Sequence, residues 1–135
     1  MNYYQQKIIN NLLERKLYFF IAVTFTIAIT IGSLIPVTNV IELPSVKFID
    51  KILHFTAYFT LTVSWLFAYY KSLKLYNKGF LIAIVLFVYG IIIEVLQGVL
   101  TTYRQADLLD IIANLIGIVT AWVFFNKIYH KNRMK

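Results

Sequence analysis

The chain has 135 residues, of which 60% are hydrophobic and only 14% are charged, and its mean hydropathy is +0.72. Soluble domains carry about 25% charged residues, so this composition excludes an ordinary soluble protein. The lack of cysteine excludes disulfides and thiolate chemistry, and in so apolar a chain the net charge of +7 indicates a membrane surface rather than nucleic acid as partner.

Four apolar stretches are long enough to cross a membrane, which takes about 20 helical residues. Residues 17–35 carry no charge, and residues 52–70, 80–100 and 108–125 carry only His54, Glu94 and Asp110. Because backbone polar groups must be paired within lipid, we expect helices over residues 17–35, 46–70, 80–100 and 107–125. The sequence thus predicts an all-α fold, a four-helix transmembrane bundle that forms a single domain over residues 1–135.

The first predicted helix has two interpretations, a cleaved signal peptide or a retained anchor. Its apolar run is longer than a signal-peptide core, and no small-residue cleavage site follows it, so we expect an anchor. Both prolines, Pro36 and Pro44, fall in the following loop, where Ser45 can cap the second helix. The links at residues 71–79 and 101–107 are short, which predicts antiparallel neighbouring helices.

Basic residues lie mostly on one side of the predicted bundle. The N-terminal segment holds three lysines and arginines, the loop at 71–79 three and the C-terminal tail four, ten of the chain's 13. The other side has only Lys47, Lys51 and Arg104. Since positively charged loops stay in the cytoplasm, both termini are predicted to be cytoplasmic.

Acidic residues show the opposite bias. Five of the six, Glu42, Asp50, Glu94, Asp107 and Asp110, fall toward the extracytoplasmic side. An ionisable group within a membrane costs about 2.5–3.5 kcal/mol, so groups in such positions indicate a function.

Helical spacing gathers polar residues into stripes that can face one another. Asp50, His54 and Tyr58 recur every four residues, and Asp110 and Asn114 share a face of the fourth predicted helix. Small residues at positions 90, 98 and 117 can let the helices approach closely. The predicted polar cluster consists of Asp50, Lys51, His54, Tyr58, Glu94, Gln97, Arg104, Asp107, Asp110 and Asn114.

The order and spacing of these residues resemble the VanZ-like family of small bacterial membrane proteins. The resemblance is carried by Asp50-Lys51-x-x-His54-x-x-x-Tyr58, Glu94-x-x-Gln97 and Arg104-x-x-Asp107-x-x-Asp110-x-x-x-Asn114-x-x-Gly117. It implies a multi-pass protein of the bacterial cytoplasmic (inner) membrane that acts in the cell envelope. The family's namesake is associated with low-level resistance to the antibiotic teicoplanin, which the resemblance implies as a role.

Each polar residue also has a simpler structural interpretation. Asp107 can cap the fourth helix, with Asp110 as the partner in a capping box. Asn114 can be a hydrogen-bond clip between helices, while Lys51 and Arg104 can form ion pairs or extend toward lipid headgroups. Glu94 lies deepest among the acids, which favours a functional role. Asp50 can orient the His54 ring and raise its basicity, so for His54 the functional and the structural interpretations both stand.

Three mechanisms remain open for the polar cluster. It can recognise or protect an envelope lipid or glycopeptide target, with Lys51 and Arg104 holding a phosphate or carboxylate. It can instead be an intramembrane enzyme for a lipid-linked substrate, with His54 or Glu94 as general base. It can also bind a divalent metal through His54, Glu94 and Asp110. No other cofactor is evident; the expected partners are membrane lipids and a lipid-linked envelope precursor, not nucleic acid, and the oligomeric state stays open.

Topology can be tested with reporter fusions. We expect a reporter active only in the cytoplasm to be active after the C-terminus, and one active only outside to be active when inserted at residues 101–107, because of the lysine and arginine bias. The reversed pattern would contradict the predicted orientation.

Overall fold

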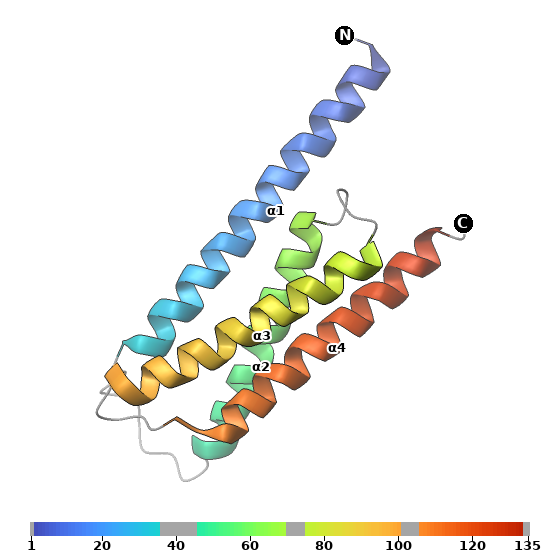
Figure 1. The fold of residues 1–135 in the computed structure, drawn as a ribbon. Coiled ribbons are helices and arrows are strands. Elements are labelled where there is room, and N and C mark those ends of the chain that lie inside the picture. Colours follow the sequence, from blue (N-terminus) through green and yellow to red (C-terminus); the bar gives the residue numbers. More distant parts are fainter. Residues whose placement is uncertain (1, 36–45, 70–74, 101–105, 134–135) are drawn as a thin grey trace.

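The computed structural model describes residues 2–35, 46–69, 75–100 and 106–133 (Figure 1). These residues form four helices: α1 (Tyr3–Leu34), α2 (Val46–Tyr69), α3 (Leu75–Leu100) and α4 (Leu108–Arg133). The described part of the chain contains no strand, and all four helices are long and apolar enough to cross a membrane. The predicted all-α four-helix transmembrane bundle is therefore confirmed.

Three helices are longer than predicted. Helix α1 begins at Tyr3 rather than near residue 17, α3 begins at Leu75 rather than near residue 80, and α4 continues to Arg133 rather than ending near residue 125. The predicted bounds followed hydropathy, which marks the hydrocarbon layer and not the helix itself. Residues 2–16 contain neither glycine nor proline, so nothing local stops α1 from continuing into a polar region. Figure 1 shows this part of α1 projecting beyond the other helices.

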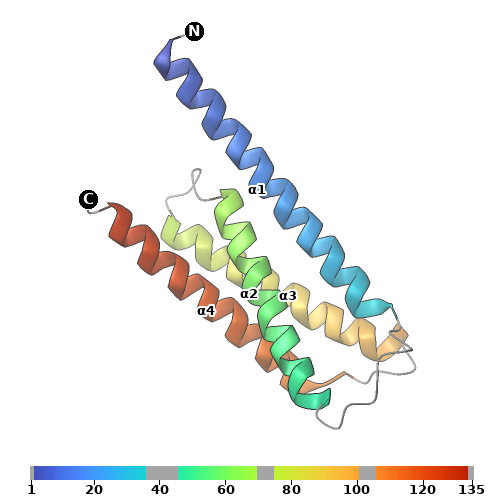
Figure 2. The same cartoon turned by 180° about the vertical axis from the view of Figure 1, so that it is seen from behind.

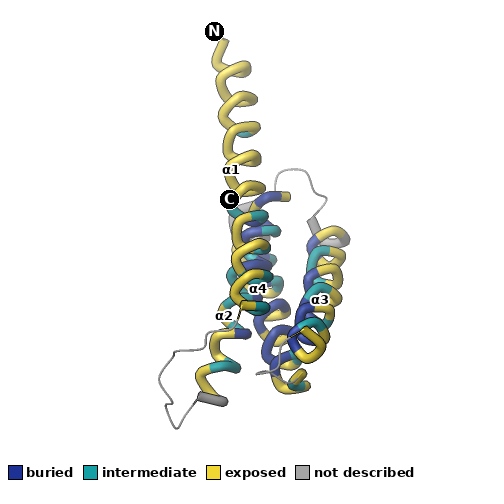
Figure 3. Tube along the Cα trace, turned by 90° about the vertical axis from the view of Figure 1, so that its left-hand side faces the viewer, coloured by how far each residue is buried: buried dark blue, intermediate teal, exposed yellow. Residues whose placement is uncertain are grey.

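Helix α2 is the centre of the bundle. It packs most extensively on α4 and next on α1, and it lies between these two helices (Figure 2). The buried core contains Tyr58 and Leu61 of α2, Leu86 of α3 and Ile118 of α4. Buried positions face the inside of the bundle, while the outer faces are largely exposed (Figure 3). Many large apolar side chains are exposed, as expected for helices whose outer faces contact lipid.

A group of hydroxyl and indole hydrogen bonds joins α1 to α2 and α3. The Trp65 indole N–H donates to the Thr26 hydroxyl at 3.1 Å, and the Tyr89 hydroxyl donates to the Thr26 carbonyl at 3.2 Å. The hydroxyls of Thr30 and Tyr89 are hydrogen-bonded at 2.8 Å. Each interhelical hydrogen bond within a membrane contributes about 0.6 kcal/mol to stability on average. The group therefore contributes modestly to holding α1 against α2 and α3.

Gly117 and Gly90 let the helices approach closely, as predicted, whereas Gly98 lies against the segment that precedes α4. A Cβ atom at Gly117 of α4 would lie 2.5 Å from the Phe55 carbonyl oxygen of α2. One at Gly90 would lie 3.0 Å from the Tyr58 ring, and one at Gly98 would lie 3.0 Å from Ala106. At Gly117 the space for a side chain is taken by the backbone of α2, which cannot move aside as a side chain could. This position therefore sets how closely α4 can approach α2.

Replacing Gly117 by alanine should destabilise the bundle. The added methyl group has no space against the α2 backbone, and overpacking of this kind costs about 1–3 kcal/mol. Thermal unfolding in detergent should show a lower Tm for Gly117→Ala. The matched control is Gly32→Ala in α1, where an added Cβ meets nothing within 4 Å and the Tm should not fall. Equal melting temperatures for the Gly117→Ala variant and the unmodified protein would contradict the close approach.

Candidate functional site

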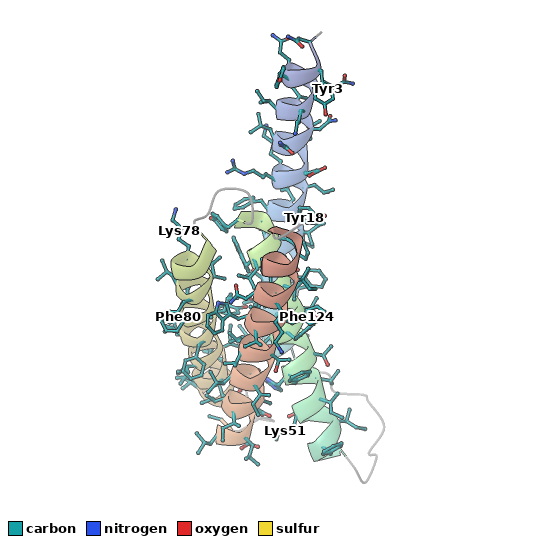
Figure 4. The ribbon with its side chains drawn as sticks, turned by 90° about the vertical axis from the view of Figure 1, so that its right-hand side faces the viewer. Tyr3, Tyr18, Lys51, Lys78, Phe80 and Phe124 are labelled. Atoms are coloured by element: carbon teal, nitrogen blue, oxygen red, sulfur yellow. The ribbon has the colours of Figure 1, made fainter. Side chains whose placement is uncertain are left out.

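Polar side chains of three helices meet at the end of the bundle opposite both termini. Figure 4 shows Lys51 at this end of α2, far from Tyr3 at the start of α1. The first turns of α2 and α4 and the last turns of α3 reach the same end, because successive helices run antiparallel (Figure 1). The topology therefore brings Asp50, Glu94 and Asp110 to one level, as their predicted depths require.

Lys51 is the positive centre of the site. Its Nζ donates hydrogen bonds to Asp107 Oδ2 at 2.6 Å and Asp110 Oδ1 at 2.5 Å, and it lies 4.0 Å from Asp50 Oδ2. Two carboxylates of α4 are thus tied to one ammonium group of α2 by charge-assisted hydrogen bonds. The predicted role of Lys51 as a clamp for an external anion has little room in this arrangement, since two of its three N–H groups are directed at aspartates.

His54 lies about one turn deeper on α2 and faces α4. Its Nδ1 is 3.1 Å from Asn114 Oδ1, whereas its Nε2 is 3.8 Å from Asp110 Oδ2 and 4.0 Å from Asp50 Oδ1. Asn114 therefore orients the ring by a hydrogen bond, and Asp50, expected from its spacing to do so, lies beyond hydrogen-bond distance. The predicted role of Asn114 as a clip between helices is confirmed.

Asp107 caps α4, and Glu94 completes the cap from another helix. Asp107 Oδ1 accepts the backbone N–H of Leu109 at 2.9 Å, which confirms the predicted N-cap. The Asp107 backbone N–H donates to Glu94 Oε1 at 2.8 Å. This is the place that Asp110 would take in a capping box, so Glu94 of α3 fills it and leaves Asp110 to Lys51 and His54.

Gln97 and Tyr58 are buried but lie in other surroundings. The Gln97 side-chain amide donates to the Ser33 carbonyl at 2.9 Å and so joins α3 to the end of α1. Sequence reasoning missed Ser33, since the contact is made by its backbone, which leaves no signature in the sequence. Tyr58 belongs to the hydrophobic core, and its hydroxyl has no hydrogen-bond partner among the described residues. Arg104 lies outside the described residues, so its place in the site stays a prediction.

Accessibility falls from the surface of the site to its interior. The side chain of Asp107 is 43% exposed, and those of Lys51 and Asp50 are 22% and 21% exposed. Those of His54 and Asp110 are only 9% and 7% exposed. The outer three side chains are therefore more accessible than the inner pair.

The described part of the site carries excess negative charge. Asp50, Glu94, Asp107 and Asp110 contribute four carboxylates, against which the described side chains supply one ammonium group, that of Lys51. Buried carboxylates in such numbers are stable only with cationic partners. Lys51 is the cationic partner that the described side chains provide to the aspartates among these carboxylates.

Four membrane-spanning helices with buried ionisable groups at one end define a multi-pass membrane protein with a polar end site. The chain belongs to the VanZ-like family, because the family model VanZ/LLP1 matches residues 4–129, nearly the whole chain. This finding confirms the resemblance drawn from the motif.

A relative occurs in a fungus. The uncharacterized protein C11E3.10 of Schizosaccharomyces pombe is 35% identical over 86 residues, which cover 64% of this chain and 51% of the relative. The chain thus spans about half the length of the curated relative it matches. No solved structure is significantly similar to the chain.

Removing the ammonium group of Lys51 should weaken the bundle. Lys51→Met leaves Asp110 buried beside other carboxylates, and breaking a buried ion pair costs about 3 kcal/mol. Chemical unfolding in detergent should show this loss, and Lys51→Met combined with Asp110→Asn should recover part of it. The control is Lys7→Met on the exposed part of α1, with unchanged stability. If Lys51→Met unfolds at the same denaturant concentration as the unmodified protein, Lys51 does not hold the helices together.

Proposed function

We propose that this VanZ-like protein acts in the cell envelope by recognising the polar headgroup of an envelope lipid at the polar end site. The observation that carries the proposal is the graded cluster, in which Lys51, Asp50 and Asp107 are partly exposed and His54 and Asp110 are buried. The attraction within a buried ion pair often does not exceed the free energy lost when the two charges leave water. Stability alone is therefore a poor reason for burying these groups, and ligand binding is a better one.

The position of the site suits a lipid ligand. The helices expose apolar side chains to the hydrocarbon layer, and the cluster lies at their ends, at the level where headgroups begin. A lipid can bring its headgroup to this level without leaving the membrane. A soluble ligand would have to approach a site whose inner residues are more than nine-tenths buried.

The proposed location is the outer leaflet of the bacterial cytoplasmic membrane. The support is the charge bias of the sequence, with ten of its 13 lysines and arginines on the side of the termini. The site lies at the opposite end of the bundle and would then face out of the cell (Figure 4).

The fungal relative favours a membrane lipid over a ligand confined to bacterial cell walls. Fungi have no peptidoglycan, whereas phospholipids occur in both kinds of cell. A function shared with the Schizosaccharomyces pombe protein would need a ligand present in both. Teicoplanin resistance through a lipid-linked wall precursor would be a bacterial specialisation of the same headgroup site.

A second candidate function is catalysis on a lipid-linked substrate. The observation that favours it is the His54 ring, held by Asn114 on one side and facing two carboxylates on the other. Such a histidine can act as general base. Glu94, the other predicted base, is engaged at Oε1 by the Asp107 backbone N–H, which favours His54 for this role.

Lipid retention tests the proposed function. The purified protein would be exchanged through detergent, and the lipids that remain bound would be identified by mass spectrometry. We expect selective retention of one lipid class, and its loss in His54→Ala, Glu94→Ala and Asp110→Ala, because these side chains form the inner site. Arg104→Ala should lose the lipid as well, as the sequence predicts.

The control is Glu14→Gln, which removes a carboxylate of α1 outside the site and should retain the lipid. Retention by all four alanine variants, with normal membrane insertion, would mean that the cluster serves packing only. Incubation of the protein with envelope lipid extract separates the two candidates, since a chemically altered lipid would favour the enzyme and reject the simple binder.

A further inference from the structure

We propose that Asp50, His54 and Asp110 form a binding site for a divalent transition-metal cation. One ligand atom from each residue lies within 4.8 Å of the other two, and no other such group of histidine and acidic side chains occurs among the described residues. The set differs from the one expected from the sequence, since Asp50 takes the place of Glu94. The inference stands apart from lipid recognition and goes beyond it.

The hydrogen bond to Asn114 decides which atom His54 presents. Asn114 Oδ1 can only accept a hydrogen bond, so the His54 Nδ1 carries the proton. In the neutral ring, Nε2 then carries a lone pair, and this lone pair faces Asp110 Oδ2 at 3.8 Å and Asp50 Oδ1 at 4.0 Å. These three electron-pair donors converge at the end of the bundle, where His54 and Asp110 are buried and Asp50 is partly exposed, and a cation between them could bind all three.

Lys51 sorts the carboxylate oxygens into two sets. It holds Asp110 by Oδ1 and lies nearest to Asp50 through Oδ2. The other oxygens, Asp110 Oδ2 and Asp50 Oδ1, are those that face His54. Metal-binding carboxylates and histidines are commonly held by hydrogen bonds to their remaining atoms. Here Lys51 donates such a bond to Asp110, and Asn114 Oδ1 accepts one from His54, whereas Asp50 lies 4.0 Å from Lys51 as an ion pair.

The size and chemistry of the donor set select the kind of cation. Bonds of about 2.0–2.2 Å in a tetrahedral arrangement place donor atoms about 3.4 Å apart, so side-chain movements of up to about an ångström close the site. One imidazole with two carboxylates suits Zn²⁺ or Mn²⁺. Three protein ligands also leave positions for water or for a phosphate oxygen.

Manganese binding tests the inference directly. The full-length protein, treated with a chelator and placed in phosphatidylcholine nanodiscs, would be titrated with Mn²⁺ and followed by electron paramagnetic resonance. We expect one ion per chain, and pulsed spectra with coupling to one imidazole nitrogen. This coupling should persist in His130→Gln and disappear in His54→Gln, because His130 is the chain's other histidine. A parallel titration with Zn²⁺ against a chromogenic chelator covers the second metal.

Substitution of a ligand should weaken binding. Asp50→Asn and Asp110→Asn each keep the side-chain shape and should raise the Kd for Mn²⁺ about 10- to 100-fold. The matched control is Asp107→Asn, which removes the same charge from the Lys51 cluster but takes no part in the donor set, and its Kd should stay close to that of the unmodified protein. Circular dichroism verifies that each variant is folded.

Three results would overturn the inference. One is the lack of stoichiometric binding of either metal by the unmodified protein, and another is an equal loss of affinity in Asp107→Asn, which would indicate attraction by charge alone. The third is a nitrogen NMR spectrum of the metal-free protein with His54 as an imidazolium at neutral pH that metal does not change. Lipid retention by a protein that binds no metal contradicts only this inference, and metal binding without lipid retention contradicts only the proposed function.

Discussion

The ammonium group of Lys51 holds the site together. It forms ion pairs with Asp107 and Asp110 of α4 from the first turns of α2, and so joins the two helices that pack most extensively in the bundle. Without a cation at this point, three aspartates from two helix ends would repel one another in partly buried surroundings. The close helix contact at Gly117 lies farther along the same pair of helices, so packing and charge fix one interface at two levels.

Hydrogen bonds from neighbouring helices position the residues beneath this ion pair. Glu94 takes the backbone N–H that Asp110 would take in an ordinary capping box, and Asp110 is then shared between Lys51 and the His54 side of the cluster. Asn114 fixes the histidine ring, a task that the spacing had suggested for Asp50. The site therefore has two levels. The Lys51–Asp107 ion pair is partly exposed, and beneath it the buried His54 faces one carboxylate oxygen each of Asp50 and Asp110.

The membrane environment makes these ion pairs unusual. On the surface of a soluble protein, an exposed lysine paired with aspartates contributes little to stability and is common without any function. Here the outer faces of the helices are apolar and the ionisable groups are concentrated at one end, with the inner ones almost fully buried. The chain that carries this arrangement belongs to the VanZ-like family over residues 4–129.

The sequence by itself determined the four spanning helices, the stripes on which His54 and Asn114 lie, and the capping role of Asp107. Hydropathy fixes which segments enter lipid. The 3.6-residue period fixes the direction in which each side chain points from the helix, and the rise per residue fixes its depth in the membrane. Only the tertiary structure decided that Lys51 lies between two aspartates of α4, that Asn114 rather than Asp50 orients His54, and that Glu94 caps α4. These pairings depend on how far the helices are rotated and how closely they approach, which side-chain packing at residues such as Gly117 sets and no single helix encodes.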